Sequence, residues 1–555
     1  YNRQCDDEWN TPPGPGTRAT PSGMGAAVPA GGNVGGSASP PDFRPIPDYA
    51  RGVSSMALEQ ARGRFLVTIA VAGSPVPFKS TTDAGGYFMI PMVPVGEPFT
   101  AVAIDTVTGE NRVATGVGPA VGDGYWLAFD FGTGESEYVD VRWDGDAGDG
   151  QWLTAANWDT NSLPQPNANV IIPAGSGTVT LNNYSGDASK VLINSVSVET
   201  GSSLALIQGT LELIADSVVA GELHLKGGDI RPQSDLVVTG SNTWHDGEIT
   251  GNGAFINQGV LTIDTDQTTN ARDLFTRIVN HGSAVLKGSK ANALRLGASG
   301  AIENASDGTF EVQGVGGVIT IGSESGPFDN LGTLIKSGVG ESRWTGPEVN
   351  HLGGTVNVLE GTLSLTEGST STGATWTVSE GAVLALGDQT REITLVGTYT
   401  GAGAGMVRLA GGEYFAIGAV GATFDFPNGG VEWAGASIDG PGVLRNDGLF
   451  TIVTGSGGGT LTGHLDNRGT MRLTGTGSEL KNRDGAIIDN ASGATFEVLG
   501  DQGIAHANDP LTFRNAGTLQ KVGGTGTSVF KACFEDLGGS ISGDIEFDEP
   551  GACGG

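Results

Sequence analysis

One string of eleven residues occurs almost unchanged at two places in the chain, and this internal repeat restricts the folds that the sequence can adopt. Residues 302–312 read IENASDGTFEV, and residues 488–498 read IDNASGATFEV, 186 positions later. The flanking segments also align, so that a block of several repeat units occurs twice, at about 244–358 and 433–543. Duplicated repeat units of this size are typical of solenoids, in which each unit buries its inner face only against its neighbours.

A shorter phrase recurs throughout residues 165–555: a glycine, usually a threonine, and then apolar, polar and apolar residues, as in GTLEL at 209–213 and GTMRL at 469–473. Each phrase predicts a short strand with period-two alternation. An asparagine precedes many of them at spacings of 21–26 residues: Asn257, Asn280, Asn304, Asn330, Asn446, Asn467, Asn490 and Asn515. Because no helical period is sustained, we predict an all-β chain with a long, right-handed parallel β-helix of about 17 coils, on the order of 80 Å long.

The recurring asparagines predict a side-chain ladder inside the β-helix. At the same place in successive coils, one amide can hydrogen-bond to the next and so satisfy a buried polar group. The glycine that follows is expected to supply backbone angles that other residues resist. Lys336 and Lys521 occupy corresponding positions of the two blocks, where an apolar residue is usual. We interpret both as outward-turned strand ends, with a ligand site as the alternative.

The first 138 residues differ in character from the repeats. Residues 1–53 are rich in Pro, Gly, Ser and Ala without apolar periodicity, which predicts an extended arm. Residues 54–138 contain alternating apolar stretches separated by turn residues, typical of a small Ig-like β-sandwich. The run VPFKSTTDAGGYFMIPMVPVGEPFTAVAIDTVTGE resembles the carboxypeptidase-regulatory-like domain family, and the resemblance implies a non-catalytic spacer at a surface. The residues that carry it are Thr82, Asp83, Gly86, Phe88, Pro94, Gly96, Ala103 and Asp105.

Residues 139–164 are expected to form a Trp-rich cap at the start of the β-helix of residues 165–555. The tryptophans are Trp143, Trp152 and Trp158. The segment resembles the stretch that opens many β-solenoids in bacterial cell-surface and autotransporter-like proteins. Candidate Ca²⁺ ligands, through their carboxylate oxygens, are Asp144, Asp146 and Asp149. The alternative is that the tryptophans plug the first coil and the aspartates lie in solvated turns, which the missing EF-hand spacing and closing Glu favour.

Charge and hydropathy exclude several kinds of partner. The formal net charge of −32 opposes binding to nucleic acid and to anionic lipid headgroups, which need Lys and Arg. The longest apolar runs are much shorter than the roughly 20 residues of a membrane-spanning helix. The chain begins at Tyr1 without a leader, which fits a mature secreted product. We therefore expect an extracellular or cell-surface location.

The three cysteines lie at the two extremities of the chain, and none stands in a zinc-ligand spacing. Their small number argues against a disulfide scaffold. The simplest arrangement pairs Cys533 with Cys553 as a staple on the last coils. Cys5 is then left free or bonded to another chain.

The function predicted from these features is structural, and we assign no catalytic or cofactor-binding residues. The ordered Asn-x-Asp, Asp-Asp, Gly-His-Gly and Arg-x-Lys phrases of polygalacturonase-like sites are missing, and the fold alone is weak evidence for an enzyme. Block duplication lengthens a rod, whereas catalysis needs one copy of a site. We predict a homo-oligomeric filament or surface fibre that assembles head to tail through the arm. The alternatives are a monomeric adhesin or stalk that binds a surface glycan, with the arm folded back on its own sandwich, and a polysaccharide lyase or glycosidase.

Overall fold

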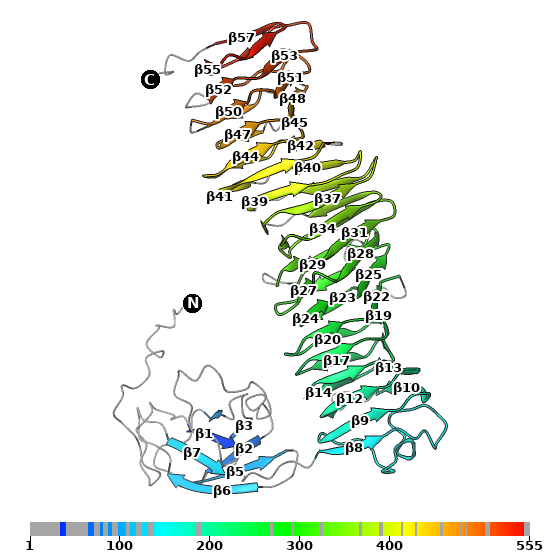
Figure 1. Ribbon diagram of the computed structural model, residues 1–555. Coiled ribbons are helices and arrows are strands. Elements are labelled where there is room, and N and C mark those ends of the chain that lie inside the picture. The colour runs from blue at the N-terminus through cyan, green and yellow to red at the C-terminus, as the bar shows by residue number, and fades with distance from the viewer. Residues whose placement is uncertain are drawn as a thin grey trace. The chain divides into compact units, whose positions relative to one another are not determined.

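Strands make up almost all of the regular structure, as the alternating apolar pattern predicts (Figure 1). The computed structural model describes residues 34–39, 65–71, 78–81, 87–90, 98–106, 111–117, 125–130, 138–183, 190–266, 270–290, 293–321, 326–365, 369–387, 392–411, 414–427, 430–455, 459–476, 479–483, 485–505 and 511–548. Within these ranges the helical structure is one 3-10 turn, η1 (Ala155–Asn157), and no helix has the length and apolar character to cross a membrane. The chain divides into two units, Tyr1–Tyr138 and Val139–Gly555.

The first unit contains two small sheets, with strand orders β4-β1-β7 and β3-β2-β5-β6. The strands are β1 (Val34–Ser39), β2 (Phe65–Val71), β3 (Phe78–Thr81), β4 (Tyr87–Ile90), β5 (Pro98–Asp105), β6 (Asn111–Val117) and β7 (Tyr125–Asp130). On β2 and β5, Val67 lies opposite Ala103 and Ile69 opposite Ala101, and all four are buried. One face of this sheet therefore carries a core, as period-two alternation requires.

Part of the predicted arm belongs to the first unit. β1 pairs antiparallel with β4 and parallel with β7. Although β1 lies in the predicted arm, it is therefore docked on its own chain. The alternative in which the arm folds back on its own sandwich requires such a contact. Of the residues that carry the family resemblance, Phe88 lies on β4, and Ala103 and Asp105 are buried on β5. The others lie outside the described residues.

The second unit is a column of parallel coils, which confirms the predicted β-helix (Figure 1). Each coil contributes strands to three faces. The first face begins with β8 (Val139–Arg142), β9 (Ala168–Ile172), β12 (Ser195–Val198), β15 (Ser217–Val219), β18 (Leu236–Val238), β21 (Phe255–Asn257), β24 (Arg277–Asn280), β27 (Ala301–Asn304), β30 (Phe328–Asn330) and β33 (Val349–His351). The second begins with β10 (Gly177–Asn182), β13 (Ser202–Gln208), β16 (Glu222–Lys226), β19 (Ser241–Asp246), β22 (Val260–Asp264), β25 (Ser283–Gly288), β28 (Thr309–Gly314), β31 (Thr333–Ser337), β34 (Thr355–Val358) and β37 (Ala374–Val378).

The third face runs through two sheets joined by a bridge between Ile319 and Thr345. Its strands are β11 (Lys190–Ile193), β14 (Thr210–Leu213), β17 (Asp229–Pro232), β20 (Glu248–Thr250), β23 (Arg272–Phe275), β26 (Leu294–Leu296), β29 (Val318–Thr320), β32 (Glu341–Trp344), β35 (Thr362–Leu365), β38 (Val383–Leu386), β40 (Met406–Ala410), β42 (Gly430–Ala434), β45 (Leu449–Thr454), β48 (Thr470–Gly475), β51 (Thr495–Val498), β53 (Thr518–Lys521) and β56 (Ser540–Ser542).

Near the middle of the column, the first and second faces run together in two long strands, β39 (Glu392–Thr400) and β41 (Tyr414–Asp425). The first half of β39 pairs with β36 (Ser369–Ser371) and its second half with β37. Beyond them the first face continues as β43 (Ser437–Asp439), β46 (Thr460–Leu461), β49 (Lys481–Asn482), β54 (Ser528–Phe530) and β57 (Ile545–Phe547). The second continues as β44 (Val443–Asn446), β47 (His464–Asn467), β50 (Ile487–Asn490), β52 (Leu511–Asn515) and β55 (Ala532–Asp536).

Glycines make the corner inside these two long strands. Gly397 and Gly421 have φ of 81° and 82°, a conformation that side chains with a Cβ rarely adopt. The register of β39 against β41 shifts between Leu395 and Gly397. The solenoid has about 15 turns between residues 169 and 542, compared with the predicted count of about 17 for the longer range 165–555.

Corresponding strands of the two copies of the duplicated block lie on different faces of the same column. Strand pairing continues along the second face from β22 through the long strands to β44. Asn257 ends β21 on the first face, whereas its counterpart in the second block, Asn446, ends β44 on the second face. GTLIK forms β31 on the second face, and its counterpart GTLQK forms β53 on the third. The second block is therefore rotated by one face.

Candidate functional site

The first asparagine ladder runs up the corner between the first and second faces. The Nδ2 group of Asn257 donates to Asn280 Oδ1 at 2.7 Å, Asn280 donates to Asn304 at 2.8 Å, and Asn304 donates to Asn330 at 2.8 Å. Each amide also donates to a backbone carbonyl of the next coil at 3.0–3.1 Å. All four side chains are fully buried. The rung above Asn330 in register is occupied by His351.

The second ladder repeats this geometry one corner further round. Asn446 donates to Asn467 at 2.8 Å, Asn467 to Asn490 at 2.9 Å, and Asn490 to Asn515 at 2.8 Å. Backbone carbonyls of Thr470, Thr495, Thr518 and Ser540 accept the second amide proton of the four rungs. Both ladders are internal, so they stabilise the column and present no surface to a ligand.

The glycine after each ladder asparagine was expected to supply backbone angles that other residues resist, and this expectation was wrong at Gly259 and Gly282. Neither has a positive φ. A Cβ on Gly259 would lie 2.1 Å from the carbonyl oxygen of Gly240, and one on Gly282 would lie 2.1 Å from that of Gly259. These positions need glycine because the backbones of successive coils approach closely there.

The interpretation of Lys336 and Lys521 as outward-turned strand ends was also wrong. The side chain of Lys336 is fully buried, and burial lowers its pKa. Its ammonium donates to the carbonyls of Ser337, Gly338 and Glu360. The side chain of Lys521 is 5 % exposed, and its ammonium contacts Asp501 at 2.7 Å. Both lysines turn inward because their ammonium groups hydrogen-bond with polar groups at the adjacent turn.

The three tryptophans of the Trp-rich cap interlock at the start of the column. Trp158 meets Trp143 edge to face with ring centroids 5.0 Å apart, and meets Trp152 at 4.9 Å. The indole N–H of Trp158 donates to the Trp152 carbonyl at 2.9 Å. Trp152 in turn donates its backbone N–H to Thr180 of β10 at 2.9 Å. The tryptophans therefore pack against the first coil.

The aspartates of this cap make turn hydrogen bonds. Asp149 accepts hydrogen bonds from the Gln151 backbone, the Thr154 hydroxyl and the Asn157 amide, and these bonds lower its pKa. Asp144 accepts a hydrogen bond from the backbone N–H of Asp146. In the described part of the chain, no three His, Cys, Asp or Glu side chains are arranged to hold a metal ion. Calcium binding at these aspartates stays a prediction from the sequence.

The cysteines can be placed only in part. Cys533 lies on β55 and is disulfide-bonded. Cys553, its predicted partner, and Cys5 lie outside the described residues.

An acidic hollow of about 480 Å³ lies on the outer surface near the corner of the second and third faces. It is lined by Gly227, Asp229, Asp246, Gly247, Glu248, Asn270, Ala271, Asp273 and Arg295. Glu248 and Asp273 are in register on β20 and β23, and Arg295 follows on β26. The backbone N–H of Glu248 donates to Asp229 Oδ1 at 2.8 Å. Four carboxylates from three consecutive coils, those of Asp229, Asp246, Glu248 and Asp273, thus line one concave surface.

The surroundings of the acidic hollow raise the pKa of two of its carboxyl groups. Desolvation raises the pKa of Asp229, and desolvation followed by the charges of Asp229 and Asp273 raises that of Glu248. Asp273 instead forms a two-bond ion pair with Arg295, with N–O distances of 2.5 Å. Carboxyl groups with raised pKa can both accept hydrogen bonds and, when protonated, donate them. Hydroxyl-rich molecules are suited to such a surface.

Sequence reasoning missed the acidic hollow because its residues are far apart in the chain. The signal that was available is that Asp229, Glu248, Asp273 and Arg295 each stand directly before an inward-facing Ile or Leu of the third face. The chain matches no protein-family model, no curated protein and no solved structure. Both family resemblances therefore stay hypotheses from the sequence.

Proposed function

We propose that the protein is a secreted structural subunit of an extracellular or cell-surface fibre, in which the solenoid sets a fixed length and copies join end to end. The observation that carries the proposal is that both copies of the duplicated block extend one column with one continuous core. Internal ladders and lysine-capped turns recur in both copies, so the duplication multiplied scaffold elements.

The last coil offers the edge for such a joint. β55, β56 and β57 each pair with one strand below, and no described residue pairs with their other edge. Leu537 and Ile541, on this coil, are 59 % and 44 % exposed. Unpaired strand edges with exposed apolar side chains invite pairing with another chain. We propose that the arm of the next copy supplies the partner, through residues of 1–53 other than β1.

Sedimentation velocity of the full-length protein tests this joint. The wild type should form larger species as its concentration rises, and two variants should remain monomeric: Ile541→Lys, which puts a charge on the edge, and a truncation of residues 1–33, which keeps β1 in its sheet. Val420→Lys is the matched control, because Val420 is 86 % exposed on β41 in the middle of the column. Monomeric wild type at high concentration, or equal association in all variants, would contradict the proposal.

A second candidate function is a stalk that binds a surface glycan without catalysing a reaction, and the acidic hollow favours this function. Its concave, carboxylate-lined surface fits a neutral or basic glycan better than an acidic one. A glycan array probed with wild type and with Glu248→Gln separates the two functions. Binding that depends on Glu248 supports the stalk, and no binding in either protein contradicts it.

A further inference from the structure

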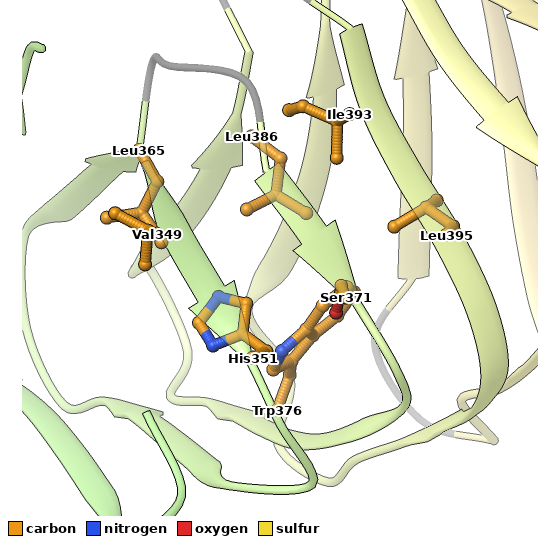
Figure 2. A pocket seen from close by; sticks show the side chains of 8 residues that line it. All are labelled: Val349, His351, Leu365, Ser371, Trp376, Leu386, Ile393 and Leu395. Atoms are coloured by element: carbon orange, nitrogen blue, oxygen red, sulfur yellow. The ribbon is translucent and has the colours of Figure 1, made fainter. Parts of the chain in front are cut away.

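A small cavity lies inside the column where the first ladder ends and the two faces begin to run together. It is lined by Val349, His351, Leu365, Ser371, Trp376, Leu386, Ile393 and Leu395 (Figure 2). It leaves about 10 Å³ for the centre of a water molecule. His351 ends β33, Ser371 ends β36 and Trp376 lies on β37, so the polar groups come from three different strands of the first and second faces.

Three polar side chains at this cavity have no hydrogen-bond partner among the described residues. They are the two ring nitrogens of His351, the hydroxyl of Ser371 and the indole N–H of Trp376. His351 is 3 % exposed, and the other two are 1 % exposed. The His351 and Trp376 rings do not hydrogen-bond to each other: their centroids are 6.1 Å apart and their planes meet at 69°. Leaving a buried donor unpaired is costly.

Other buried tryptophans of the column satisfy this donor directly. Trp244 donates to the carbonyl of Gly247 at 2.9 Å, Trp433 to that of Ala436 at 2.8 Å, and Trp344 to the hydroxyl of Ser342 at 3.2 Å. Trp376 differs because its indole N–H borders the cavity. The indole N–H is therefore hydrogen-bonded in these three tryptophans, whereas that of Trp376, beside the cavity, has no partner among the described residues.

We propose that the cavity is a binding site for one buried water molecule. The volume fits one water, and a buried water needs two to four polar partners. The water accepts the indole N–H of Trp376, donates to a ring nitrogen of His351, and exchanges a third hydrogen bond with Ser371 Oγ. It thereby joins strands of the first and second faces at the point where the asparagine ladder stops.

Oxygen-17 magnetic relaxation dispersion of the full-length protein counts long-lived internal waters and tests the site. Ser371→Val fills the space with methyl groups, and Trp376→Phe removes the N–H donor. Each variant should lose about one long-lived water relative to wild type. Trp344→Phe is the matched control, since its indole N–H is satisfied by Ser342, and it should keep the wild-type count.

Far-UV circular dichroism and a cooperative unfolding transition establish that each variant is folded. If Ser371→Val fails this check, Trp376→Phe decides alone. Unchanged water counts in a folded site variant, or the same loss in Trp344→Phe, would overturn the proposal.

Discussion

Replacing one rung of a ladder should destabilise the protein by an amount that the hydrogen bonds determine. Asn304 donates to Asn330 Oδ1 at 2.8 Å and to the Thr333 carbonyl at 3.1 Å, and it accepts from Asn280 Nδ2 at 2.8 Å. Asn304→Ala leaves the Asn330 oxygen without its donor and removes one acceptor of Asn280. A buried polar group that loses its partner costs about 1–3 kcal/mol. We expect the free energy of unfolding to fall by about 1–3 kcal/mol.

A double-mutant cycle separates the ladder from a general packing effect. Asn280→Ala and Asn304→Ala remove the same shared hydrogen bond, so the second substitution should cost less than it does in wild type, by about 1 kcal/mol. Asn304→Ala and Asn467→Ala lie in different ladders, and their costs should add within about 0.5 kcal/mol.

Urea denaturation followed by circular dichroism and by tryptophan fluorescence provides the free energies. Values are compared only where both probes give the same midpoint, because repeat arrays can depart from two-state unfolding. Additive costs for the neighbouring pair, or coupling of equal size between the ladders, would refute the account of stacked amides.

Three further perturbations test other buried and surface groups. Burial lowers the pKa of His351 from 6.5 to about 4, so its neutral form stabilises the fold above pH 6.5 and this contribution is lost as pH falls to about 4. Between pH 7 and pH 4, the free energy of unfolding of wild type should therefore fall by about 3 kcal/mol more than that of His351→Asn, measured by denaturant titration. Equal losses in the two proteins would contradict this. Lys336→Met should cost about 1–3 kcal/mol in the same titrations by leaving turn carbonyls without a donor, and an unchanged stability would show that a hydrophobic side chain serves as well. Glu248→Gln should stabilise the protein by roughly 0.2–1 kcal/mol at pH 7 in the same titrations, because it relieves repulsion from Asp229 and Asp273. This gain should shrink at low pH as Glu248 protonates. A destabilised variant would contradict this.

The ladders and the β-helix could be predicted because the pattern that encodes them is local. An asparagine followed within a few residues by glycine and an alternating strand recurs in eight of the coils, so spacing alone brings Asn280 beside Asn304. The rotation of the second block could not be predicted in this way. It depends on the corner at which each asparagine lies, and this changes between the blocks, where the long strands β39 and β41 lie.

Residues whose role depends on how a turn folds, or on the next coil, could not be interpreted from the sequence. The inward direction of Lys336 follows from carbonyl groups of its own turn and of the next coil. Asp149 was a candidate calcium ligand by type, but its oxygens accept hydrogen bonds from Gln151, Thr154 and Asn157. In both cases the residue type was visible and its partners were not.

Negative-stain electron microscopy of the full-length protein over a range of concentrations tests the proposed end-to-end assembly most directly. About 15 turns at about 4.8 Å per strand layer give a solenoid of roughly 70 Å. The account predicts filaments in which thin segments of roughly 70 Å recur, and their loss in Ile541→Lys. Single rods of that length at every concentration of wild-type protein would contradict it.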